Sequence, residues 1–250
     1  MEHITLWNLL AILFIALGAG FVQSSIGFGF AIIALPFIVM ILPLKQSVAI
    51  LSILGTLCYI RNTYKLRKDI DMKIVMIPLV ASMAGRVLGM QFLMGSEGEY
   101  IKIFLGFSFV VLAIYFAFYK NRVQIQYTVK NGLIFGFISG VFGGMFNISG
   151  PPIVLYFMAG NLSKERYMAN LQLYFMLATL FSVMLHILYG NVVWSTVAFS
   201  GVGYIGVLIG SIIGLKVFHK MNVNVFNKAV YIFLAVSGIY TIITSAAAVL

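Results

Sequence analysis

The stretch Gly140-Val-Phe-Gly-Gly-Met-Phe-Asn147-Ile-Ser149-Gly150-Pro151-Pro152 interrupts a long apolar region in the second half of the chain. Glycine adopts backbone angles that other residues avoid, and proline removes a hydrogen-bond donor and ends a helix. The apolar run that follows, 152–160, would rise only about 13 Å as a helix and cannot cross a hydrocarbon core of about 30 Å. The region 129–160 is therefore expected to form a helical hairpin whose tip lies inside a membrane.

A second interruption of the same kind lies near the beginning of the chain. It reads Gly18-Ala-Gly-Phe-Val-Gln23-Ser24-Ser25-Ile-Gly27-Phe-Gly29, and the apolar run 30–43 behind it would rise about 21 Å. We expect a second hairpin over 4–43. Irregular backbone at this depth is tolerated only where protein buries it or where it lines a water-filled cavity.

The composition places the whole chain in a membrane. Of the 250 residues, 62% are hydrophobic and 9% are charged, whereas soluble domains carry about 25% charged residues. The sequence predicts one all-α polytopic membrane domain with about ten hydrophobic segments. These segments are 4–22, 30–43, 46–60, 73–94, 100–119, 129–146, 152–160, 168–188, 194–218 and 225–249.

The basic residues predict how the segments are oriented. Lysine and arginine concentrate in alternate connections, which is the positive-inside pattern of an inner or plasma membrane protein. The net charge of +10 is thus explained by the membrane, and no nucleic-acid partner is expected. Both termini, 95–99 and 189–193 are expected outside the cell, and the cytoplasmic connections are 61–73, 120–130, 160–168 and 216–228.

The two halves of the sequence resemble each other. Residues 25–29 align with 147–151, and the small residues Ala81, Gly85 and Gly89 align with Gly206, Gly210 and Gly214. Since each half holds five segments, the second half runs through the membrane in the opposite direction. We expect two inverted repeats, 1–125 and 126–250, and transporters built in this way bind substrate where their broken helices meet.

The two interruptions supply the candidate binding residues. A broken helix exposes free N–H groups and the positive end of its dipole, both of which favour an anion. Close packing of helices through small residues is the alternative explanation of each cluster. The expected substrate contacts are Gln23, Ser24, Ser25, Gly27, Gly29, Asn147, Ser149, Gly150 and Pro151.

Arg86 is the one charged residue that lies well inside a predicted segment. All six acidic residues fall in connections or at the N-terminus. An ionisable residue inside a membrane normally has a partner and a function, and an unpaired buried guanidinium is costly. We therefore expect an anionic substrate to be its partner, held by the planar guanidinium fork. Snorkelling of the side chain or pairing with backbone carbonyls is the structural alternative.

The sequence Ser25-Ile-Gly-Phe-Gly29 with Leu35-Pro36, together with Asn147-Ile-Ser-Gly-Pro-Pro152, resembles the paired glycine-rich motifs of the sulfite exporter TauE/SafE family. The likeness covers the whole chain, although Ser25, Phe28, Asn147, Ser149 and Pro151 stand where the family pattern has more glycine. The resemblance implies a transporter of small sulfur-containing anions such as sulfite or a sulfonate. An inside-negative potential drives anions outward, by about 2.3 kcal/mol per charge per 100 mV, so export of an anion needs no coupling ion.

Other functions remain open from the sequence. An ion channel or a non-transporting scaffold would share the composition. A remote alternative is an intramembrane serine protease with Ser149 as nucleophile and His186 as base, although His186 is expected near the outer surface. No cofactor is expected, and Cys58 is the single cysteine. The glycines at 206, 210 and 214 are expected to pack helices within the protomer or in a homodimer.

Overall fold

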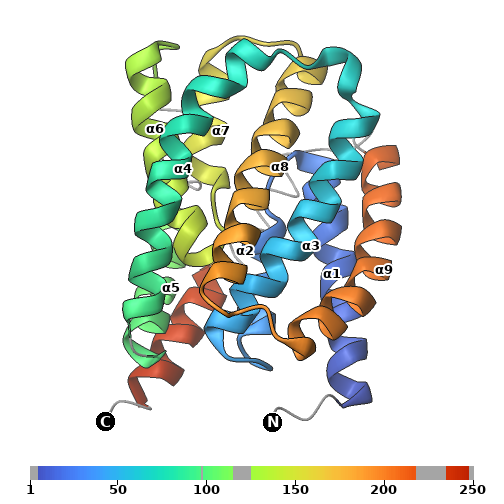
Figure 1. The fold of residues 1–250 in the computed structure, drawn as a ribbon, viewed down its shortest axis with the longest axis vertical. Coiled ribbons are helices and arrows are strands. Elements are labelled where there is room, and N and C mark those ends of the chain that lie inside the picture. Colours follow the sequence, from blue (N-terminus) through green and yellow to red (C-terminus); the bar gives the residue numbers. More distant parts are fainter. Residues whose placement is uncertain (1–4, 97, 115–124, 218–234, 248–250) are drawn as a thin grey trace.

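The computed structural model describes residues 5–96, 98–114, 125–217 and 235–247 (Figure 1). Within these ranges the regular structure is helical. The chain forms α1 (Leu6–Ile26), α2 (Phe30–Ile38), α3 (Leu44–Lys65), the short 3-10 helix η1 (Arg67–Asp69), α4 (Met72–Gly95), α5 (Gly98–Ile114), α6 (Val129–Phe146), α7 (Gly150–Ala159), α8 (Lys164–Leu188), α9 (Trp194–Val217) and a last helix, Ala235–Ala247.

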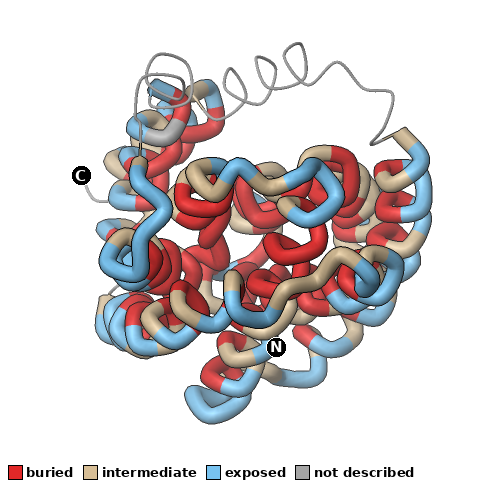
Figure 2. Tube along the Cα trace, turned by 90° about the horizontal axis from the view of Figure 1, so that it is seen from above, coloured by how far each residue is buried: buried red, intermediate tan, exposed pale blue. Residues whose placement is uncertain are grey.

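The lengths and compositions of these helices are those of a polytopic membrane protein. Five of the described helices, α1, α4, α6, α8 and α9, are long and apolar enough to cross a bilayer. Exposed positions lie on the outer perimeter of the bundle and buried positions face inward (Figure 2), and many of the exposed residues are large and apolar. The expected segments 100–119 and 225–249 extend into 115–124 and 218–234, which lie outside the described residues.

Both predicted interruptions are breaks between two helices. α1 ends at Gly27, with φ of 101°, and α6 ends at Asn147, with φ of 58°. These left-handed angles stop each helix, and a short helix follows each break: α2 behind the first and α7 behind the second. One further similarity links the halves, because a threonine side chain caps the first turn of each long helix: Thr5 caps α1 and Thr128 caps α6.

The most extensive helix contacts join the two halves of the chain. α1 packs along α9, and α4 packs along α6. Both contacts rely on glycine, since a Cβ atom at Gly206 or Gly210 would collide with backbone carbonyls of α1, and one at Gly140 with that of Ser82 in α4. The glycine ladder of α9 is therefore used within the chain. In both contacts a helix of the first half packs on a helix of the second half, as two interlocked five-helix repeats would. The boundary between residues 125 and 126 stays a prediction.

The connections gather at two opposite ends of the bundle. At one end Arg166 forms an ion pair with Asp71 at 2.9 Å, which joins the start of α8 to the connection 66–71. At the other end Asn191 contacts the Met94 sulfur at 3.2 Å, and the Lys45 ammonium donates to the Met94 carbonyl at 2.9 Å. The structure groups these connections as the alternation of basic loops predicts, and which end faces the cytoplasm stays a prediction.

Candidate functional site

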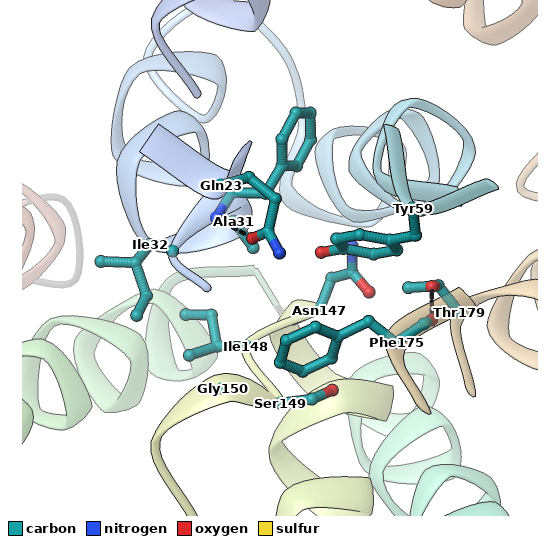
Figure 3. A pocket seen from close by; sticks show the side chains of 12 residues that line it. Gln23, Ala31, Ile32, Tyr59, Asn147, Ile148, Ser149, Gly150, Phe175 and Thr179 are labelled. Carbon is teal, nitrogen blue, oxygen red and sulfur yellow. Dashed lines mark hydrogen bonds between the residues drawn. The ribbon is translucent and has the colours of Figure 1, made fainter. Parts of the chain in front are cut away.

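Both helix breaks meet at one pocket in the interior of the bundle (Figure 3). Side chains of α3 and α8 close it from the opposite side. The space available to a water-sized sphere is about 10 Å³, which is room for about one water molecule. The residues around it are Gln23, Gly29, Phe30, Ala31, Ile32, Tyr59, Asn147, Ile148, Ser149, Gly150, Phe175 and Thr179.

The first break is stabilised by two glutamine side chains. Gln23 Nε2 and Gln172 Nε2 donate to the carbonyl oxygen of Gly27, at 2.7 and 2.9 Å. Gln23 Oε1 in turn accepts from the backbone N–H of Phe30 at 3.1 Å. Backbone groups that the break removes from the helix are thus satisfied without water, and Gln23 still reaches the pocket.

The two serines of the first break face neighbouring helices. Ser24 Oγ accepts from Asn62 Nδ2 at 3.0 Å, which ties the end of α1 to α3. Ser25 Oγ donates to the carbonyl oxygen of Phe21 at 2.7 Å and lies 3.3 Å from that of Gly214 in α9. Neither serine borders the pocket, so their hydroxyls hold the hairpin in place.

The second break brings an unsatisfied amide to the pocket. Asn147 is buried, and neither its Oδ1 nor its Nδ2 has a hydrogen-bond partner among the described residues. Figure 3 shows the amides of Gln23 and Asn147 beside the same space, with Tyr59 next to them. A buried polar group without a partner costs free energy. Asn147 is therefore available to bind a ligand.

Ser149 connects the pocket to Arg86. Arg86 Nη2 donates to Ser149 Oγ and Nη1 donates to Ser182 Oγ, both at 2.5 Å, while Nε has no partner in the described ranges. The guanidinium is fully buried. It lies against Gly143, where a Cβ atom would come within 2.8 Å of the guanidinium carbon.

No carboxylate neutralises Arg86 within the part of the chain that the structure describes. The two ion pairs found there, Lys102–Glu99 and Arg166–Asp71, lie at the ends of the bundle. The hydrogen-bond partners of the guanidinium are two neutral serine hydroxyls, and neither supplies a negative charge. The site thus holds a buried positive charge one hydroxyl away from a polar pocket, which is an arrangement that attracts an anion.

His186 is more buried than its position near a helix end suggests. Its side chain is 1% exposed, and its Nδ1 lies 3.2 Å from the Asn191 amide nitrogen. Ser149 Oγ accepts from Arg86, and no hydrogen bond joins it to His186. The pair expected for a serine protease is therefore not formed in this structure.

Five of the predicted site residues border the pocket and five do not. Gln23, Gly29, Asn147, Ser149 and Gly150 border it; Ser24, Ser25, Gly27 and Pro151 lie in the breaks outside its wall, and Arg86 reaches it through Ser149. The pocket is also bordered by three residues of α3 and α8 that were not predicted from the sequence: Tyr59, Phe175 and Thr179. The last two lie four residues apart on α8, with Ser182 on the same face, and this helical spacing was the available signal.

One of the comparisons with known proteins gives a match. A family model described as "Sulfite exporter TauE/SafE" matches residues 12–241 of the chain. No curated protein and no solved structure gives a significant match.

Proposed function

Since the chain belongs to the sulfite exporter TauE/SafE family, we propose that it carries a small anion, sulfite or a small organic sulfonate, out of the cell. The observation that supports this proposal most directly is the buried guanidinium of Arg86, which has no carboxylate partner in the described ranges and contacts the pocket residue Ser149. An arriving oxyanion would supply the missing negative charge.

The pocket offers groups suited to an oxyanion. The N-terminal ends of α2 and α7 both reach it, through Gly29 and Gly150, and the positive dipole end of a helix favours negative charge. Asn147 adds an unused amide. Half-helices that point their N-termini at an anion near the membrane midplane are a recurring device of transporters with inverted repeats.

The pocket is small in this structure. About 10 Å³ does not accommodate an anion of four heavy atoms such as sulfite. We propose that the two hairpins move apart alternately toward each end of the bundle, so that the same residues bind the anion from either side.

The driving force follows from the charge of the substrate. Moving one negative charge out of a cell at an inside-negative potential of 100 mV releases about 2.3 kcal/mol. Among the described residues no carboxylate lies in the interior to carry a proton. Export of a sulfite anion down this potential therefore needs no coupled ion.

Flux measurements in proteoliposomes test the proposal. Purified protein should support saturable, potential-dependent movement of sulfur-labelled sulfite, and sulfite should raise the melting temperature of the protein. Thiosulfate, sulfate, taurine, sulfoacetate and simple carboxylates establish the substrate class. Flux that does not saturate would indicate a channel, and the absence of both flux and thermal stabilisation across the panel would overturn the proposal.

A further inference from the structure

Arg61 is a second arginine that turns into the protein. It was expected in the connection 61–73, but the structure places it inside α3, which continues to Lys65. Its Nη1 donates to Ser211 Oγ of α9 at 3.1 Å. Ser211 is fully buried and Arg61 is half-buried, so the side chain points inward rather than snorkelling to the membrane surface.

Arg61 also has no carboxylate partner in the described parts of the chain. Neither of the two ion pairs there involves it. Its hydrogen bond to a serine hydroxyl repeats the arrangement of Arg86, which donates to Ser149 and Ser182. A guanidinium has five N–H donors, and a neutral hydroxyl uses one of them.

Each arginine stands beside one helix break. Arg86 contacts Ser149 in the second break directly. Arg61 precedes Asn62, whose amide donates to Ser24 at the first break. On α9, Gly214 lies three residues after Ser211, and its carbonyl oxygen lies 3.3 Å from Ser25 Oγ. The Arg61–Ser211 contact is therefore part of the packing around the first hairpin.

The repeat relates the two arrangements. The register that aligns Gly85 with Gly210 also aligns Arg86 with Ser211, and it aligns Arg61 with His186. Both arginines belong to the first repeat, 1–125. Arg61 comes from α3 and faces α9. Arg86 comes from α4 and faces α8, the helix that carries Ser182 and His186. The first repeat thus supplies a guanidinium to each of two helices of the second repeat.

The two arginines lie toward opposite ends of the bundle. Arg61 and Ser211 are close to the ends of α3 and α9, and α3 leads directly into the connection that pairs with Arg166. Arg86 lies in the later part of α4, which ends beside Asn191 at the other end of the bundle. The pocket is bordered by Tyr59, which lies two residues before Arg61 on α3, and by Ser149, which contacts Arg86.

From this geometry we infer that Arg61 and Ser211 form a second station for the substrate anion, on the other side of the pocket from Arg86. The inference rests on the proposed function. In this structure the Ser211 hydroxyl accepts a hydrogen bond from the guanidinium of Arg61. When this side opens, the anion replaces Ser211 and is held by the planar fork. The anion then passes one arginine on each side of the pocket.

Flux into membrane vesicles of both orientations tests the inference. Arg61→Gln should raise the KM for sulfite roughly tenfold on the face near Arg61, the loss of one charge-assisted contact, and should change it much less on the opposite face. Arg61→Lys should give an intermediate value because it keeps the charge. Lys65→Gln is the matched control, since Lys65 is exposed on the same helix and should leave both faces unchanged.

Ser211→Ala supplies a test of opposite sign. It removes the group that competes with the anion for Arg61, so it should lower the KM on that face, whereas a purely structural contact would make both variants poorer. Equal KM values for wild type and Arg61→Gln on both faces would overturn the second station. Should Arg61→Gln not accumulate as folded protein, Ser211→Ala decides the question alone. Wild-type vesicles without saturable sulfite flux would instead overturn the proposed function.

Discussion

The guanidinium of Arg86 donates through Nη2 to the hydroxyl of Ser149, and this contact joins the charge of α4 to the break between α6 and α7. The two residues are 63 positions apart in the sequence. No charged side chain borders the pocket directly. The contact between Arg86 and Ser149 is what connects a positive charge to it. Movement of the second hairpin must therefore change the environment of Arg86.

Replacement of Arg86 should separate binding from folding. Arg86→Met removes a membrane-buried charge, so the protein should insert and remain monodisperse, while the KM for sulfite rises roughly 100-fold or transport is lost. Arg86→Lys keeps the charge without the planar fork and should show a smaller loss. Transport assays and thermal shift with sulfite check both. An unchanged apparent affinity in Arg86→Met would make the residue structural.

Two adjacent glycines should respond differently to alanine. At Gly143 a Cβ atom meets the movable ends of Arg86 and Ser149, so Gly143→Ala should impair transport with little loss of thermal stability. At Gly144 it meets the backbone of α4, so Gly144→Ala should destabilise the protein by about 1–3 kcal/mol. Melting temperatures and flux separate the two effects.

The control for both variants is Gly201→Ala, because no atom lies within 4 Å of a Cβ atom at that position. It should resemble wild type in stability and in flux. If Gly143→Ala transported normally, the guanidinium would not need its present position against α6.

The Asn147 amide should lower the stability of the folded protein and contribute to the binding of substrate. Its backbone is left-handed, with φ of 58°, and its buried amide has no partner in the described ranges. Asn147→Gly fits this conformation and removes an unsatisfied group, so the melting temperature should stay equal or rise. The KM for sulfite should increase. Asn147→Ala, which keeps the strain, should lower the melting temperature, and an unaltered KM in both variants would exclude the amide from the site.

The orientation in the membrane can be tested with an impermeant maleimide. In a Cys58→Ala background, Tyr189→Cys should be labelled in intact cells and Lys68→Cys only after permeabilisation. The expectation follows from the bias of lysine and arginine toward the cytoplasmic side. The structure places the two positions at opposite ends of the bundle. The reverse labelling pattern would mean that the end of the bundle near Arg61 faces outward. Labelling of both positions from outside would contradict the fold.

Local chemistry explains which parts of the site could be predicted. Gly27 and Asn147 end helices because of their own backbone preferences, so the breaks were visible in the sequence. Arg86 was visible because the sequence around it is apolar. In contrast, Ser24 and Ser25 lie in the same kind of glycine-rich interruption as Ser149, yet their hydroxyls face α3 and α9. Only the packing of the hairpin decides which hydroxyl faces the pocket.

Long-range contacts explain what the sequence could not show. Gln172 holds the carbonyl of Gly27, and its partner lies 145 positions away. Arg61 was expected in a connection because it begins a basic run, yet α3 continues past it and Ser211 accepts its hydrogen bond. Tyr59 and Thr179 belong to the pocket only because α3 and α8 cross beside it.

The exchange of partners between the halves also has a consequence for how the protein is made. α1 leaves the ribosome well before α9, along which it packs, because α2 to α8 lie between them in the sequence. Until then the face of α1 that receives Gly206, Gly210 and Gly214 has only lipid or an insertion factor to cover it. Such distant pairing makes assembly slow, because the long intervening segment must be closed before the contact forms. Premature release from the insertion machinery would therefore be most harmful before α9 is synthesised.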